Sequence, residues 1–115
     1  MTIEDFEILA RKRFDHCLNL LTWQKHKEYT RDNDKLYNFK RAGEILRCTP
    51  EQALIGMWIK QIVSLIDIVE DIEHKRAWAG DLESFIAILE EKVTDVIAYV
   101  PLLEALIKER MGKNE

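Results

Sequence analysis

Three groups of charged and aromatic residues have the composition of a binding site. The first surrounds a polar break near residue 30 and consists of Lys25, Lys27, Tyr29, Lys35, Tyr37, Asn38 and Lys40. Lysine side chains and the free amides at a helix amino end bind phosphate, and tyrosine rings stack on nucleobases. This group is therefore the first candidate for contact with an anion or a nucleotide. The alternative is an ordinary solvated helix end.

The other two groups are polar stripes on expected helices. One stripe comprises Lys60, Ser64, Asp67, Asp71 and His74, with Glu70 beside it. The other comprises Ser84, Glu91, Lys92, Asp95 and Tyr99. Like charges four residues apart, such as Glu91 and Asp95, destabilise a helix unless a cation offsets them. Each stripe is either a solvated helix face or a polar seam beside a cleft that holds a charged ligand.

Several segments also resemble known families. Residues 27–29, 34–36, 38–40 and 48–51 resemble a family of small uncharacterised phage and prophage proteins, over most of the chain from Lys25 onward. The segment 91–95, with Tyr99, resembles that family and also the second acidic motif of the all-α nucleoside triphosphate pyrophosphohydrolases, the MazG-like group. In those enzymes, two acidic motifs on neighbouring helices hold Mg²⁺ against the triphosphate.

This resemblance implies a set of metal ligands. The first acidic motif would correspond to Asp67 and Glu70, with Asp71 or Glu73 nearby, and the second to Glu91 and Asp95. Lys92 stands where those enzymes usually carry another glutamate, so it removes one oxygen ligand from a site for Mg²⁺. Lys60 and Lys92 would then point toward phosphates.

The implied function is nucleotide binding on a MazG-like scaffold, as a phage counter-defence protein that sequesters or hydrolyses a nucleotide or cyclic nucleotide. Whether the chain is an enzyme stays open at this point. The alternative is a non-enzymatic phage inhibitor of a host defence protein complex. Aromatic residues concentrate in interface hot spots, and the candidate anchors are Trp23, Trp58, Trp78 and Tyr37.

Composition limits the partners and the compartment. The 115 residues, with a net charge of −4, only four glycines and two prolines, predict one soluble helical domain over residues 1–115. An acidic chain is a poor ligand for duplex nucleic acid. No signal peptide or membrane span is expected, so we expect the cytoplasm, that of the host if a phage encodes the chain.

Helix signals predict an all-α, antiparallel four-helix bundle with long, short, long and long helices near 3–29, 35–47, 50–74 and 82–110. Thr2, Thr49 and Asp81 are the expected amino-terminal caps. Pro101 should kink or restart the last helix, and the tail should fray from about Met111.

Two apolar faces stand out in this pattern. The first helix has an inward stripe of Ile3, Phe6, Ala10, Phe14, Cys17, Leu18 and Leu21. The third helix is apolar nearly all round, which predicts burial nearly all round. One small bundle can hardly cover such a helix, and MazG-like proteins assemble as oligomers, so we expect a homo-oligomer.

Overall fold

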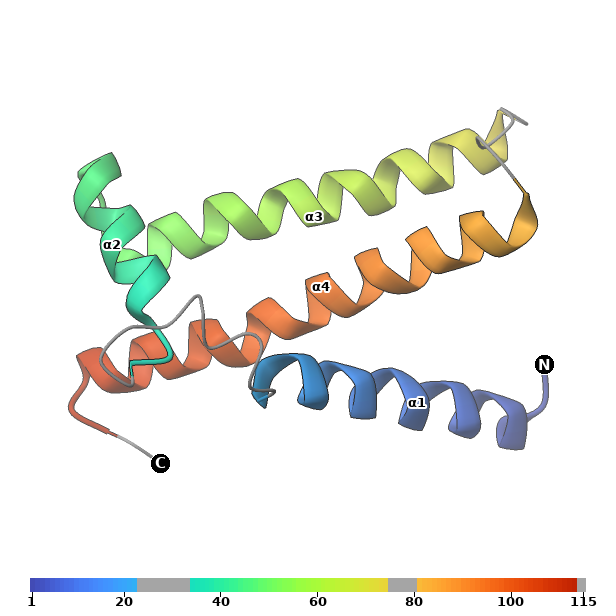
Figure 1. The fold of residues 1–115 in the computed structure, drawn as a ribbon, viewed down its shortest axis with the longest axis horizontal. Helices are drawn as coiled ribbons and strands as arrows, with labels where there is room; N and C mark the ends of the chain where they lie inside the picture. Colours follow the sequence, from blue (N-terminus) through green and yellow to red (C-terminus); the bar gives the residue numbers. More distant parts are fainter. Residues whose placement is uncertain (23–33, 75–80, 114–115) are drawn as a thin grey trace.

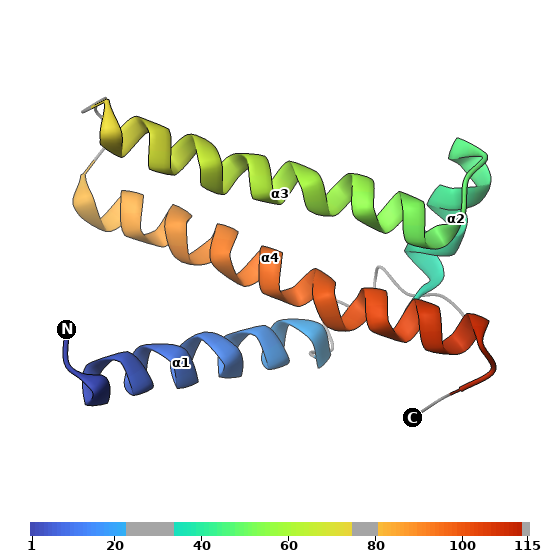
Figure 2. The ribbon, with the colours of Figure 1, turned by 180° about the vertical axis from the view of Figure 1, so that it is seen from behind.

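The computed structural model describes residues 1–22, 34–74 and 81–113, and in them the chain forms an all-α helical bundle, as predicted. The helices are α1 (Ile3–Thr22), α2 (Tyr37–Leu46), α3 (Pro50–Glu73) and α4 (Leu82–Arg110). Figure 1 shows α4 in the middle, with α3 antiparallel to it on one side and α1 on the other. The view from behind in Figure 2 agrees, and α2 crosses the end where α3 begins and α4 ends.

The three predicted helix caps are confirmed. Thr49 Oγ1 accepts from the Gln52 N–H (3.1 Å) and Gln52 Oε1 accepts from the Thr49 N–H (3.0 Å), a capping box at the start of α3. Asp81 Oδ1 accepts from the Ser84 N–H (2.8 Å) at the start of α4. Thr2 Oγ1 accepts from the Asp5 N–H (3.0 Å) at the start of α1.

The Thr49 cap gives a first testable prediction. Thr49→Ala should lower the free energy of unfolding by about 1 kcal/mol, because the Gln52 amide in the first turn loses its acceptor, Thr49 Oγ1. Thr49→Ser keeps the hydroxyl and should recover most of that loss. Ser64→Ala, in the middle of the same helix, should stay within about 0.5 kcal/mol. Urea denaturation followed by circular dichroism measures all three; equal losses for Ser64→Ala and Thr49→Ala would contradict the role of the cap.

The corner between α2 and α3 depends on backbone geometry. Arg47 adopts the left-handed conformation (φ 58°), and the Cys48 N–H then donates to the Gly43 carbonyl at 2.9 Å. A Cβ atom on Gly43 would lie 2.8 Å from the Cys48 carbonyl oxygen, so the turn requires glycine there. This corner directs α2 across the start of α3 and the end of α4 (Figure 2).

The carboxyl end of α4 departs in part from expectation. The helix continues through Pro101 and does not restart there. Where fraying was expected from Met111, Gly112 takes a positive φ (74°) and the Lys113 N–H donates to the Lys108 carbonyl at 2.7 Å, which closes the last turn. The predicted extension of the first helix from residue 23 to 29 lies outside the described residues.

The core lies where α2 crosses α3 and α4. Its buried members are Leu36, Phe39, Leu54 and Leu106. Met57, Trp58, Tyr99, Leu102 and Leu103 pack around them. Lys40 Nζ ties α2 to α4 by its contact with Glu109 (2.5 Å), and it also contacts Asp34 just before α2 (2.7 Å).

A second, polar contact joins α1 to α4. The buried Arg13 guanidinium donates to Thr94 Oγ1 and to the Glu90 carboxylate, each at 2.9 Å. One turn later, Cys17 Sγ lies 3.5 Å from the Thr94 carbonyl oxygen. From Arg13 to Cys17 along α1, the contacts on α4 move from Glu90 to Thr94. The two helices therefore run in the same direction, as Figure 1 also shows.

Two burial predictions are wrong for the single chain. On α1, Phe6, Phe14 and Leu18 are exposed, although the predicted stripe turned them inward. On α3, Ile59 and Ile66 are among several half-exposed residues, although burial all round was expected. The reason is the layered arrangement: α4 lies between α1 and α3, so each outer helix is covered on one side. The radius of gyration, 16.6 Å, exceeds the roughly 13 Å of a compact domain of this length.

Candidate functional site

A cleft of about 530 Å³ opens to solvent between the helices near the core. Its apolar walls are Leu20, Leu21, Phe39, Met57, Ala98 and Leu102. Its polar lining consists of Lys35, Asn38, Gln61, Asp95 and Tyr99. Apolar walls with a few polar groups, at this volume, are typical of sites for small organic ligands.

Asp95 supplies the acidic group of the cleft. Burial raises the pKa of the Asp95 carboxyl above its ordinary value, the neighbouring Glu91 raises it further, and Lys92 acts in the opposite direction. Lys92 Nζ donates to Gln61 Oε1 on α3 at 3.4 Å. The cleft therefore places a carboxyl with an increased affinity for a proton beside an amide that a lysine orients.

Tyr99 forms part of an aromatic wall. Its ring meets that of Phe39 edge-on, with centroids 6.3 Å apart and planes inclined at 66°. Burial raises the pKa of the Tyr99 hydroxyl, and the charge of Asp95 raises it further. The hydroxyl therefore stays protonated at neutral pH and can donate a hydrogen bond.

The amino end of α2 is held in place by Asp34. Its Oδ1 accepts from the Leu36 N–H at 3.0 Å, and its Oδ2 accepts from Lys40 Nζ at 2.7 Å. The hydrogen bond from Lys40 holds the pKa of the Asp34 carboxyl below its ordinary value. Lys35 and Asn38, on this fixed segment, consequently face the same cleft as residues of α4.

Four predicted site residues meet in this cleft: Lys35, Asn38, Asp95 and Tyr99. Lys40, from the same predicted group, is instead engaged by Asp34 and Glu109, and their hydrogen bonds raise its pKa. Lys92 contacts the cleft through Gln61. The predicted Lys25, Lys27 and Tyr29 lie outside the described residues.

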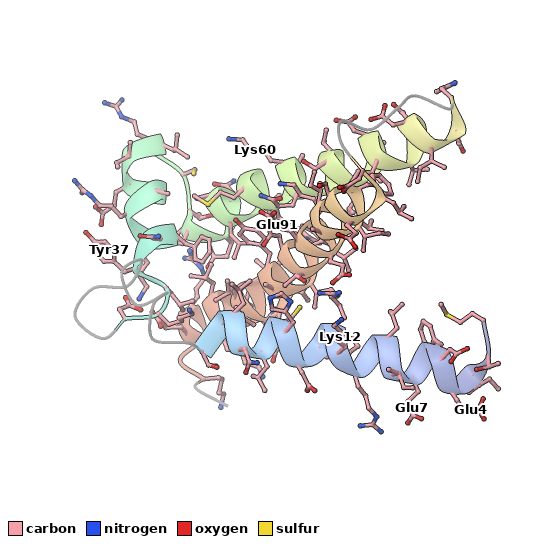
Figure 3. All side chains as sticks on the ribbon, turned by 45° about the vertical axis from the view of Figure 1, so that its right-hand side comes forward. Glu4, Glu7, Lys12, Tyr37, Lys60 and Glu91 are labelled. Carbon is pink, nitrogen blue, oxygen red and sulfur yellow. The ribbon has the colours of Figure 1, made fainter. Side chains whose placement is uncertain are left out.

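The remaining candidates lie elsewhere. Lys60, Asp67, Glu70 and Glu91 are exposed, and Asp71 and Tyr37 are half-buried; none of these six lines the cleft. Figure 3 shows Tyr37 on α2, well separated from Lys60 and Glu91.

The two acidic stripes are not brought together in the part of the chain that the structure describes. No group of three His, Cys, Asp or Glu side chains suited to a metal ion occurs there. The physical reason is their orientation: Asp67 faces outward on α3, whereas Asp95 faces the cleft from α4. The MazG-type ligand set implied by the resemblance is thus not assembled by these residues.

One predicted interface anchor is part of the bundle interior. Trp58 packs against the core, and its indole Nε1–H donates to the Val96 carbonyl at 3.0 Å. It links α3 to α4, so within this chain Trp58 serves the packing of the bundle. Trp23 and Trp78 lie outside the described residues.

Sequence reasoning missed Gln61. Its signal was present, because Gln61 lies between Trp58 and Leu65 on the inward side of α3. An amide in the middle of a buried face needs a hydrogen-bond partner, which Lys92 supplies across the cleft.

Comparison with known proteins returned no matching family model, no matching curated protein and no matching solved structure.

Proposed function

We propose that this chain binds a nucleotide, with the base in the cleft and the phosphate directed toward Lys35. The observation that supports this most is the meeting of Lys35 and Asn38 with Asp95 and Tyr99 in one cleft. They come from separate segments that the sequence had singled out independently.

The lining suits the parts of a nucleotide. The walls formed by Phe39, Met57 and Leu102 can cover the flat face of a base. Asn38, Gln61 and Asp95 offer donors and acceptors for its edge. A carboxyl whose pKa is raised by burial donates a hydrogen bond when protonated and accepts when ionised. Lys35, exposed beside the cleft, supplies the positive charge for phosphate.

The proposed activity is sequestration. Asp95 is the one carboxylate that faces the cleft among the described residues, and Lys92 lies near it. Mg²⁺ in nucleotide sites is held by carboxylate and phosphate oxygens, and a single carboxylate with a lysine beside it offers few ligands for the metal. The resemblance to MazG-like and phage proteins supports a nucleotide or cyclic nucleotide as the ligand, and a counter-defence role would need only its removal from solution.

A melting-temperature screen with nucleotides and cyclic dinucleotides, with and without Mg²⁺, tests the proposal. A ligand at about 100 times its dissociation constant should stabilise the fold by roughly 2.7 kcal/mol. For a domain of this size that corresponds to a shift on the order of 10 °C. Chromatography of the same mixtures detects turnover: Mg²⁺-dependent product would replace sequestration with hydrolysis. No shift with any nucleotide would overturn the proposal.

Variants assign the contacts. Asn38→Ala should weaken binding about tenfold or more, since one good hydrogen-bonding side chain contributes roughly 1–3 kcal/mol. Lys35→Ala should remove the preference for a nucleotide over its nucleoside and leave nucleoside affinity unchanged. Arg41→Ala is the matched control, because Arg41 lies on the same helix, pairs with Glu44 and is absent from the cleft lining. Equal losses in Arg41→Ala and Asn38→Ala would place the ligand elsewhere.

A further inference from the structure

The outer side of α3 carries an apolar stripe that the described chain leaves open. Its members, here called the outer stripe, are Ile55, Ile59, Val63, Ile66 and Val69. Their exposed fractions range from 39% to 55%. At about 100° per residue they span roughly 120° of the helix circumference, the width of a face that packs against a core. Contiguous apolar faces of this kind mark interaction surfaces.

The charges beside the outer stripe indicate what covers it. Lys60 and Asp67 are seven residues apart and so lie on the same edge of α3. Neither forms an ion pair within the described part of the chain. Residues at the same flanking heptad position, on one edge of the helix, face each other when two copies of one helix pack antiparallel around a two-fold axis. An axis near Val63 would therefore place each Lys60 opposite Asp67 of the partner subunit.

The same register leaves room for Glu70, the charged residue that lies within the outer stripe. Glu70 is exposed and lies within the arc of the outer stripe. An axis midway between Val63 and Ser64, which pairs residue 60 with residue 67, places Glu70 level with residue 57, next to Gly56 of the partner subunit. A Cβ atom added at Gly56 meets no atom within 4 Å, so the surface there is open and can receive the Glu70 side chain. We infer that a second copy of this chain packs antiparallel on the outer stripe and forms a symmetric dimer.

A lipid bilayer is the competing cover. Among the described helices, α3 is long and apolar enough, by length and composition alone, to cross a membrane. However, Lys60 and Asp67 lie in its middle, and a charged residue at a bilayer centre costs roughly 2.5–3.5 kcal/mol or more. The opposite side of α3 is already packed on the core through Leu54 and Trp58. A second copy of the chain covers the outer stripe and also provides ion-pair partners for Lys60 and Asp67.

Light scattering at micromolar concentration, without nucleotide, tests the dimer separately from ligand binding. The expected mass is twice the 13.6 kDa of the chain. Ile59→Asp buries a charge in each half of the interface and should weaken association by at least about 100-fold. Ile45→Asp, at an exposed isoleucine on α2, should leave the dimer intact. Unchanged helical circular dichroism shows that both variants fold, and a monomeric wild-type chain overturns the inference.

Charge reversal tests the antiparallel register. Lys60→Glu and Asp67→Lys should each weaken the dimer about tenfold, because each creates two like-charge contacts across the axis. The double variant restores opposite charges and should recover the wild-type affinity. A dimer that responds additively to the two reversals would overturn this register.

Flotation with vesicles of phosphatidylcholine and phosphatidylglycerol tests the bilayer. The dimer should stay with the soluble fraction. A monomer that floats with vesicles, and that Ile59→Asp releases, would overturn the inference and assign the outer stripe to lipid.

Discussion

Leu54→Ala is expected to lower the free energy of unfolding by about 3 kcal/mol. Leu54 is 0% exposed and belongs to the buried cluster that joins α2, α3 and α4. Truncation removes the transfer free energy of three carbon atoms and leaves a cavity that the surrounding helices only partly fill, which costs about 2.7–5 kcal/mol in well-packed cores. The lower part of that range applies because the open bundle can relax around the site. Urea denaturation at fixed protein concentration measures the loss.

Two controls separate the cavity from other effects. Leu46→Ala, on α2 and 64% exposed, should change stability by no more than about 0.5 kcal/mol. Leu54→Met conserves most of the volume and should cost less than about 1.5 kcal/mol. Because Met57 and Tyr99 pack on the same cluster and line the cleft, Leu54→Ala should also weaken nucleotide binding. A loss equal to that of Leu46→Ala would show that the core lies elsewhere.

The second large effect is expected at Arg13. Arg13→Ala should cost about 2–3 kcal/mol, because the guanidinium, in a residue only 8% exposed, donates to Thr94 and to Glu90. Removing one partner of a buried pair leaves the other without compensation, at a cost of about 3–5 kcal/mol. The expected value is smaller because the Glu90 side chain is 39% exposed and water can replace the lost contact. Arg11→Ala, on the exposed side of α1 with Glu7 as its partner, should stay within about 0.5 kcal/mol.

The Arg13 contact also predicts a pH dependence. The hydrogen bond from Arg13 holds the pKa of Glu90 below its ordinary value of 4.5. A carboxyl whose pKa is lower in the folded state stabilises the fold above its unfolded pKa, and this stability is lost as the pH falls through the folded value. The stability difference between wild type and Arg13→Ala should therefore be full at neutral pH and shrink below about pH 4.5. A difference that stays constant down to pH 3 would mean that Arg13 acts through Thr94 and packing and not through the charge of Glu90.

Local signals in the sequence determined the helices. Thr49 with Gln52, and Asp81 before Leu82, define helix starts because their side chains bond to amides only three residues away. Such interactions need no tertiary partner, so the all-α class and the start of each capped helix could be predicted directly.

The direction and partner of each helix face depended on the tertiary structure. The apolar pattern of α1 predicted that Phe14 would be inward, yet α1 packs on one side of α4 and buries Arg13 instead. The spacing of apolar residues gives the direction of the apolar face of a helix, but it does not give the width of the neighbouring surface that covers this face. For the same reason, α3 was predicted to be buried all round, whereas within one chain α4 covers only one side of it.

For the candidate site too, part could be predicted from the sequence and part depended on the tertiary structure. Its chemistry was readable from the residues, because Lys35, Asn38, Asp95 and Tyr99 belong to polar groups on helices and at a helix end. Their meeting required the fold: Phe39 packs against Tyr99 and so brings the start of α2 to the middle of α4. Which carboxylate would face the cleft, Asp95 rather than Asp67, was decided by how α3 is turned on α4. The spacing of residues in the sequence sets where each side chain lies around its own helix. Packing between helices decides which of these side chains come together.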